Sequence, residues 1–215
     1  MSRYQWEPSY GLAGRYRDTR TGRYVSAATV RRELDAYLDA SDNAARALAE
    51  ALRNRQISLV DWELSARRMI KNVQINAVVM ERGGYANMRP EDWGRVGAAV
   101  RRQYEYLTNF GLQIMDGTQR LDGTFIRRME MYAQAGRRTF YASKHANLDG
   151  KVTHVQSVRH ARDSCRSCVE LDRKWFRIGD PAYRMPGDRE CRVNCRCTEA
   201  YAVLDGGELI EMGEA

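Results

Sequence analysis

Every cysteine of the chain lies between residues 165 and 197. The spacing is C-x2-C, then 22 residues, then C-x3-C-x-C, formed by Cys165, Cys168, Cys191, Cys195 and Cys197. A C-x2-C turn places two thiolates on one face of a zinc ion, and a second cysteine cluster after a short hairpin completes a tetrahedral site. The segment has few large apolar residues, so the metal would supply its folding free energy. The spacing therefore predicts a small module built around structural zinc.

A tetrahedral zinc site takes four ligands, whereas the chain offers five cysteines. The spacing predicts Cys165, Cys168 and Cys195 as three of them. The fourth is Cys191 or Cys197. A C-x3-C loop is a conventional zinc knuckle, whereas the side chains of a C-x-C pair diverge in a strand, so Cys191 is narrowly favoured. All five cysteines remain candidate ligands.

Other uses of the thiols explain their spacing less well. Disulfides need an oxidising environment, and a redox-active C-x2-C pair needs a thioredoxin-like βαβ context, which the sequence lacks. His154 and His160 are alternative ligands outside the cysteine pattern. A catalytic zinc would need an open coordination position and a base such as Glu170. Because the segment matches neither an HNH nuclease nor the H-x-E pattern of a deaminase, we expect no catalytic residues and no enzyme activity.

Residues 26–147 carry apolar positions at helical spacing, which predicts four helices that bury their stripes against one another in a bundle. The expected boundary signals are caps, a Gly-Gly stop and a first-turn proline: Ser26 or Thr29, Ser58, Gly83–Gly84 and Pro90. We expect the first helix to break near Ser41–Asp42 and the fourth to run unbroken over residues 123–147. Gly97 and Gly111 lie on helix faces, where they are expected to allow close helix packing.

The pattern changes near residue 148. A turn at Asp149–Gly150 is followed by strand-forming residues, and Lys174–Ile178 reads as another short strand. The sequence therefore predicts an α+β fold, mainly α, in which a helical body precedes a β-rich, zinc-ribbon-like module. The expected organisation is an extended N-terminal arm, the helical body, the zinc-binding module and an acidic C-terminal tail, at residues 1–25, 26–147, 148–199 and 200–215.

The formal net charge is +7, and only four of the 35 basic residues are lysines. Arginine suits bidentate contact with phosphate, although a GC-rich genome would produce the same bias. The candidates for non-specific contact with DNA are Arg20, Arg23, Arg31, Arg32, Arg101 and Arg102. The chain has no run of 18 apolar residues and its N-terminus lacks the apolar centre of a secretion signal, so we expect no membrane contact and folding in a reducing cytoplasm.

The residues around the last cysteines resemble a known family. The run "VNCRC", ending at Cys197 and preceded by "DSCRSCVELD", resembles the C-terminal signature of phage head morphogenesis proteins of the phage-Mu F type, also called minor head proteins. That signature commonly reads His-Pro-Asn-Cys-Arg-Cys. Here the last four residues match, but Arg192–Val193 replace His-Pro. The family histidine is a plausible ligand, and Cys191 stands one residue earlier, where it could take its place.

The resemblance extends over most of the chain, because "RDTRTGRYVS", "ISLVDWELSARRMIKNV", "ERGGYANMRPEDWGRVG" and "RRQYEYLTNF" are similar to the region that precedes the signature in tailed-phage proteins. It implies a minor structural protein of the virion head that contacts portal or capsid proteins, oligomerises in the particle and touches packaged DNA. The protein would be in the host cytoplasm during assembly. The alternatives are a zinc-ribbon regulator that binds nucleic acid and, less favoured, a zinc-dependent nuclease.

Overall fold

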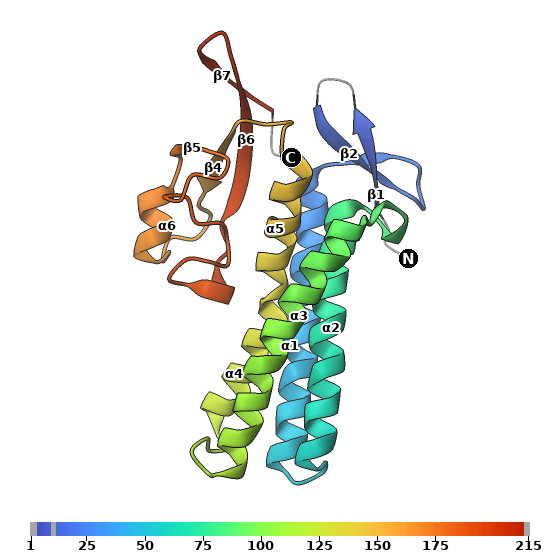
Figure 1. Cartoon of the computed structure of the whole chain (residues 1–215), viewed down its shortest axis with the longest axis vertical. Coiled ribbons are helices and arrows are strands. Elements are labelled where there is room, and N and C mark those ends of the chain that lie inside the picture. Colours follow the sequence, from blue (N-terminus) through green and yellow to red (C-terminus); the bar gives the residue numbers. More distant parts are fainter. Residues whose placement is uncertain (1–3, 10–11, 213–215) are drawn as a thin grey trace.

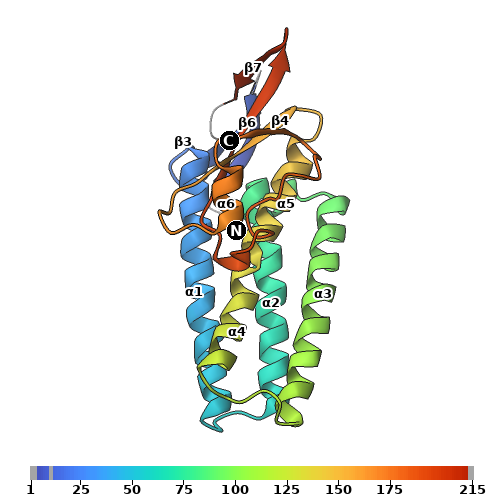
Figure 2. The same cartoon turned by 90° about the vertical axis from the view of Figure 1, so that its left-hand side faces the viewer.

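Five helices form the body of the protein in the computed structural model, which describes residues 4–9 and 12–212. Their bounds are α1 (Ala27–Arg53), α2 (Leu59–Arg82), α3 (Pro90–Met115), α4 (Gly123–Gln134) and α5 (Gly136–Leu148). Helices α4 and α5 follow one another end to end and together make the fourth column of the bundle (Figure 1). Figure 2 shows α1, α2 and α3 side by side as the other three columns.

The predicted helix boundaries are confirmed where a local capping contact sets them. The Ser26 hydroxyl accepts from the backbone N–H of Thr29, and the Ser58 hydroxyl accepts from that of Asp61. Gly83 ends α2 in the left-handed conformation, with φ 69°. Because glycine has no Cβ, it adopts this conformation without steric cost, which explains why the helix ends there.

Two expected features of the helices are wrong. Helix α1 runs without a break through Ser41, because the Ser41 hydroxyl donates to the backbone carbonyl of Tyr37, 2.8 Å away, and so remains satisfied within the helix. The expected single fourth helix divides at Ala135, between α4 and α5. Gly136 begins α5, and the side chains of Leu38 and Val73 leave no room for a Cβ at this position.

Gly136 allows close helix packing, whereas Gly97 and Gly111, which were expected to, do not. A Cβ on Gly136 would lie 2.7 Å from Val73 Cγ1 and 3.0 Å from Leu38 Cδ2. A Cβ on Gly97 would meet no atom within 4 Å, and one on Gly111 would meet only Glu63 Oε2, at 3.9 Å. Only the first position lacks room for a side chain.

We expect Gly136→Ala to lower the free energy of unfolding by about 1–3 kcal/mol, because the methyl group overpacks the α1–α2–α5 contact. Gly97→Ala is the matched control. It lies exposed inside α3 and should raise stability by about 0.5–1 kcal/mol, because alanine favours the helix. Urea unfolding followed by circular dichroism measures both. Equal effects of the two substitutions would contradict the packing role of Gly136.

Two apolar clusters fill the bundle. In the part furthest from the sheets, Trp62 is fully buried and packs edge-on against Phe110, with ring centroids 5.5 Å apart, and against Phe125 at 5.8 Å. The second cluster, nearer the sheets, joins α1, α2 and α5 through residues such as Leu38 and Phe140. The predicted bundle and its apolar stripes are confirmed.

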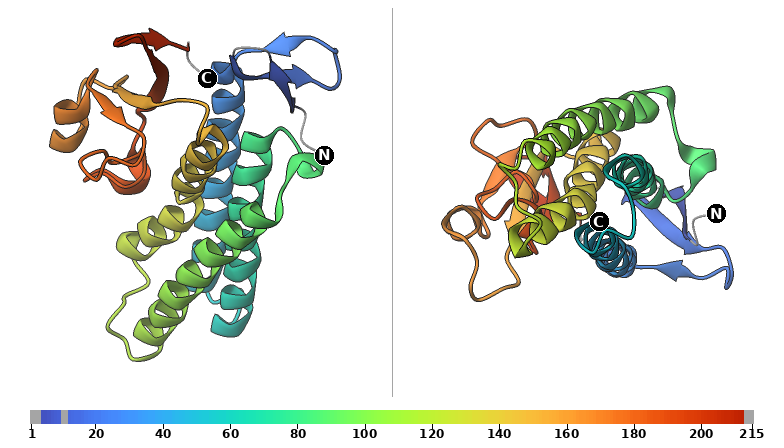
Figure 3. Two further views of the ribbon diagram at one scale, coloured as in Figure 1. Left: turned by 45° about the horizontal axis from the view of Figure 1, so that its top comes forward. Right: turned by 90° about the horizontal axis from the view of Figure 1, so that it is seen from below.

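The N-terminal residues form a sheet, so the expected extended arm is wrong for the part that the structure describes. Strands β1 (Tyr4–Ser9), β2 (Leu12–Asp18) and β3 (Tyr24–Val25) pair antiparallel in that order. Tyr16 is buried, and its hydroxyl donates to the backbone carbonyl of Glu81 at the end of α2, 2.7 Å away. Figure 3 shows this sheet on the α1–α2 side of the bundle.

A second sheet forms the C-terminal module. Its strands are β4 (His154–Val158), β5 (Trp175–Arg177), β6 (Thr198–Asp205) and β7 (Glu208–Glu211), in the antiparallel order β5-β4-β6-β7. The short helix α6 (Arg166–Leu171) lies beside them. The module packs on the α4–α5 side of the bundle (Figure 3). The predicted mainly helical α+β class is confirmed.

The predicted boundary near residue 148 agrees with the end of α5, but the boundary at 199 does not hold. Strand β6 runs across it, and Tyr201 is fully buried opposite Val155 of β4. The part of the expected acidic tail up to residue 212 therefore belongs to the sheet; the last part, 213–215, lies outside the described residues. No helix in the described ranges is long and apolar enough to span a membrane.

Candidate metal centre

Three short segments bring the five thiols together. Cys165 caps the start of α6 and Cys168 lies in its first turn. Cys191 and Cys195 flank a 3₁₀ turn, η2 (Arg192–Asn194), and Cys197 directly precedes β6. Cys168, Cys195 and Cys197 are buried, Cys165 and Cys191 are half-buried, and all five are free thiols.

The sulfur atoms form two triads that share Cys168. In each triad, Cys165–Cys168–Cys191 and Cys168–Cys195–Cys197, the sulfurs all lie within 4.8 Å of one another. The Cys168 sulfur is 3.5 Å from that of Cys191 and 3.8 Å from that of Cys195. Four sulfurs at the usual zinc–sulfur distance of about 2.3 Å have tetrahedral edges of about 3.8 Å. The cluster can therefore hold a metal ion.

The two candidates for the fourth ligand are placed differently. Cys191 closes a triad with Cys165 and Cys168 and also interacts with the Cys195 thiol. Cys197 closes a triad only with Cys168 and Cys195. Each candidate therefore lies within 4.8 Å of two of the other three predicted ligands, and the sulfur separations do not distinguish Cys191 from Cys197.

Arg189 places a buried positive charge against the thiols. Its side chain is only 2% exposed, and its Nη1 lies 2.8 Å from the Ser157 hydroxyl and 3.7 Å from the Cys168 sulfur. Its Nε donates to the backbone carbonyl of Arg184, 2.8 Å away. A donated bond from Cys197 and then the charge of Arg189 hold the pKa of the Cys195 thiol well below its usual value, although burial opposes this. Cys195 therefore favours the thiolate, which is the metal-binding form, whereas burial raises the pKa of the Cys168 and Cys191 thiols.

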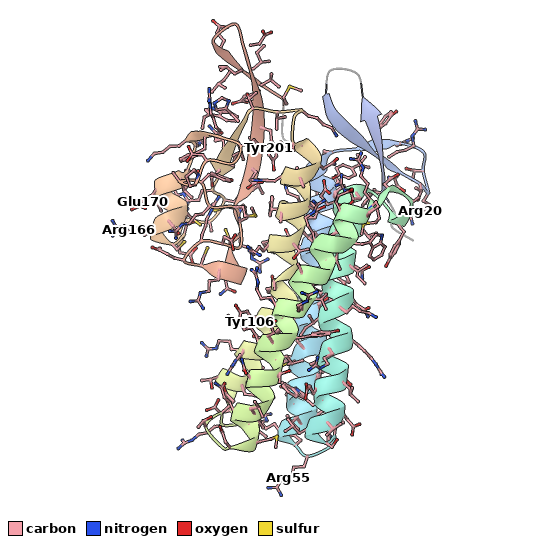
Figure 4. The ribbon with its side chains drawn as sticks, in the orientation of Figure 1. Arg20, Arg55, Tyr106, Arg166, Glu170 and Tyr201 are labelled. Carbon is pink, nitrogen blue, oxygen red and sulfur yellow. The ribbon has the colours of Figure 1, made fainter. Side chains whose placement is uncertain are left out.

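The alternative ligands and the candidate base belong to neither sulfur triad. The ring of His154 is hydrogen-bonded to the Thr153 hydroxyl at 2.9 Å, and that of His160 to the Thr198 hydroxyl at 2.8 Å. Among the described residues, the groups that can hold a metal contain no histidine. Glu170 is ion-paired with Arg166 at 2.7 Å, and both project from the outer side of α6 (Figure 4).

Sequence reasoning missed a buried polar network next to the thiols. The fully buried Glu199 carboxylate lies 2.9 Å from Nε2 of His145 on α5 and accepts a hydrogen bond of 2.7 Å from the Tyr183 hydroxyl. Tyr201 donates to it at 2.5 Å. Burial alone would lower the pKa of His145, but the charge and hydrogen bond of Glu199 outweigh it and raise that pKa. The network joins β6 to the bundle.

The sequence carried one overlooked sign of this network. Glu199 follows Cys197 by two residues, at the end of the segment assigned to the zinc-binding module, and an acidic residue inside a strand needs a partner when it is buried. The partner, His145, is 54 residues away on another element. Nothing in the local pattern links the two.

Comparisons with models of protein families, with curated proteins and with solved structures find no match to this chain. The resemblance to phage head morphogenesis proteins therefore depends on the sequence motifs alone. The thiol cluster is the feature of the structure from which a function can be argued.

Proposed function

We propose that the thiol cluster is a closed structural zinc site with Cys165, Cys168, Cys191 and Cys195 as ligands. The observation that carries the metal site is that the Cys191 and Cys195 sulfurs lie 3.5 and 3.8 Å from that of Cys168, close to the edge length of a zinc–thiolate tetrahedron. Cys191 is preferred to Cys197 as the fourth ligand because a C-x3-C loop is a conventional zinc knuckle. Zinc suits a site made only of thiolates, because these soft ligands select it over harder cations. When bound, the ion joins α6 to the η2 turn and so holds the module together.

Cys197 then has a different role from the four ligands. It is buried, and its backbone carbonyl accepts a hydrogen bond of 3.4 Å from the Tyr141 hydroxyl on α5. It therefore anchors the start of β6 on the bundle. Its thiol lies beside the four ligands but does not bind the ion. Measured zinc content tests the proposal: about one ion per chain is expected after purification without chelator, and a metal-free, folded protein contradicts it.

Arg189 should tune this site. We expect Arg189→Leu to weaken zinc binding by about 10–100-fold, because the thiolates lose the buried charge beside them. Arg184→Leu removes the same charge from an exposed side chain and is the matched control. Competition with a chelator of known affinity measures both variants. An unchanged affinity in Arg189→Leu would show that the guanidinium only packs.

At the level of the whole protein, we infer a minor structural protein of a tailed-phage head that contacts portal or capsid proteins, and not an enzyme. The support is the resemblance of the cysteine signature and helical segments, together with a bundle whose surface leaves Val60, Leu64, Leu112 and Met115 at least half exposed. Such apolar positions suit contacts with other subunits.

Particles purified from an infected host test this role. The chain should be found in the head by mass spectrometry, at a fixed copy number, and electron microscopy should place it beside the portal or capsid. A chain absent from the particles would instead favour the zinc-ribbon regulator that binds nucleic acid. Sequence-specific binding to a duplex would separate that regulator from a particle component.

A further inference from the structure

A hollow of about 520 Å³ lies between the bundle and the C-terminal module. One wall comes from α3 with Arg102 and Tyr106, and from the α4–α5 column with Arg138. The other wall comes from the module segment that leads to η2, with Arg184 and Arg192. Cations from three separate parts of the fold therefore line one hollow.

Most of this charge is not neutralised within the protein. The side chains of Arg102, Arg184 and Arg192 are exposed and have no hydrogen bond or ion pair with any residue in the part of the chain that the structure describes. Arg138 is ion-paired with Asp188. The remaining acid of the lining, Glu190, accepts from the backbone N–H of Ser167. The hollow therefore attracts an anion.

A second hollow of about 380 Å³ continues the first along the bundle. The two share Gln103, Tyr106 and Met131, and the second adds Arg128 and the amide side chain of Asn109. The Tyr106 side chain is 54% exposed at the junction, on the side of the bundle that the module faces (Figure 4). The result is a groove with cations at both ends, and an open aromatic ring with amides between them.

We propose that this groove binds single-stranded nucleic acid, with phosphates on the arginines and a base stacked on Tyr106. Separated cations match a chain of regularly spaced phosphates. An exposed aromatic ring stacks on a nucleic-acid base, whereas the side chains of an acidic peptide have no ring to stack on it. The amides of Gln103 and Asn109 can bond to base edges. A duplex keeps its bases stacked inside, so it cannot use Tyr106. The site goes beyond the proposed virion role and does not depend on it.

Binding of a labelled oligothymidylate of about 12 nucleotides to the full, zinc-loaded chain, followed by fluorescence anisotropy at low salt, tests this. We expect Arg102→Glu to weaken binding by about tenfold or more. Arg55→Glu is the matched control: it makes the same charge change at the far end of the bundle and should alter binding less than about twofold (Figure 4). Both side chains are exposed, so the fold is preserved in each variant.

Tyr106→Ala separates stacking from charge, because it leaves the net charge unchanged. It should weaken binding by about fivefold or more, whereas Tyr85→Ala, at a ring of similar exposure elsewhere, should not. Equal losses in Arg102→Glu and Arg55→Glu would overturn the proposal, because they indicate a diffuse charge effect. Competition by polyglutamate as effective as by unlabelled oligothymidylate would assign the groove to an acidic protein, and equal affinity for a duplex would exclude the stacked base.

Discussion

Replacing Cys168 by serine is expected to abolish metal binding and to unfold the C-terminal module while the helices of the bundle remain formed. Cys168 is the corner that both sulfur triads share, and it is 1% exposed. Structural zinc contributes an apparent binding free energy of about 10–16 kcal/mol, which the module loses with the ion. The bundle keeps its helices because the clusters around Trp62 and Leu38 do not include the thiols.

Three measurements follow this expected result. Elemental analysis should show no zinc, limited proteolysis should cleave within residues 150–212, and circular dichroism should retain most of the helical signal. Cys197→Ser is the control, with a milder effect, because Cys197 is not one of the four proposed ligands. A severe effect of Cys197→Ser together with a mild one of Cys191→Ser would show that the fourth ligand is Cys197. Full zinc content in Cys168→Ser would contradict the site itself.

The second large effect is expected from Glu199→Ala, which should lower the free energy of unfolding by about 3–5 kcal/mol. The carboxylate is fully buried, and its partners His145, Tyr183 and Tyr201 lose their shared hydrogen-bonding group together. Removing one member of a buried charged network leaves the others unpaired, and that desolvation cost exceeds the value of one hydrogen bond. Because β6 also begins beside the thiols, the module should detach from α5.

Urea unfolding of the zinc-loaded protein measures this loss. Glu208→Ala removes a carboxylate from an exposed position on β7 and should change stability by no more than about 0.5 kcal/mol. Glu199→Gln keeps the shape and should retain part of the stability, since an amide oxygen still accepts a hydrogen bond. If Glu199→Ala were as stable as the control, the network would not hold the module on the bundle.

The thiols and the Glu199 network hold the module in different ways. The thiols connect α6 to the η2 turn within the module, and the Glu199 network connects β6 to α5. Loss of the ion should therefore disorder the module, whereas loss of Glu199 should leave the zinc site formed and free the module from the bundle. Zinc content in the Glu199→Ala variant distinguishes these outcomes: it should stay near the wild-type value.

The sequence alone determined the features that depend on neighbours along the chain. Ser58 and Gly83 marked the ends of α2 because a cap needs only the adjacent turn. The apolar repeat predicted the bundle because an amphipathic helix must bury its stripe. The five cysteines predicted a common site because two short spacings and one connecting segment limit where the thiols can lie.

Only the tertiary structure decided what depends on contacts between distant segments. The break before Gly136 is explained by Leu38 and Val73 on other helices. The N-terminal strands, expected to be an extended arm, pack on the bundle because Tyr16 is buried against Glu81. Glu199 carries the same acidic group as the exposed Glu208, yet it is buried because His145 meets it across 54 residues. Local periodicity cannot predict such a partner, because burial and charge pairing depend on how the elements pack against one another.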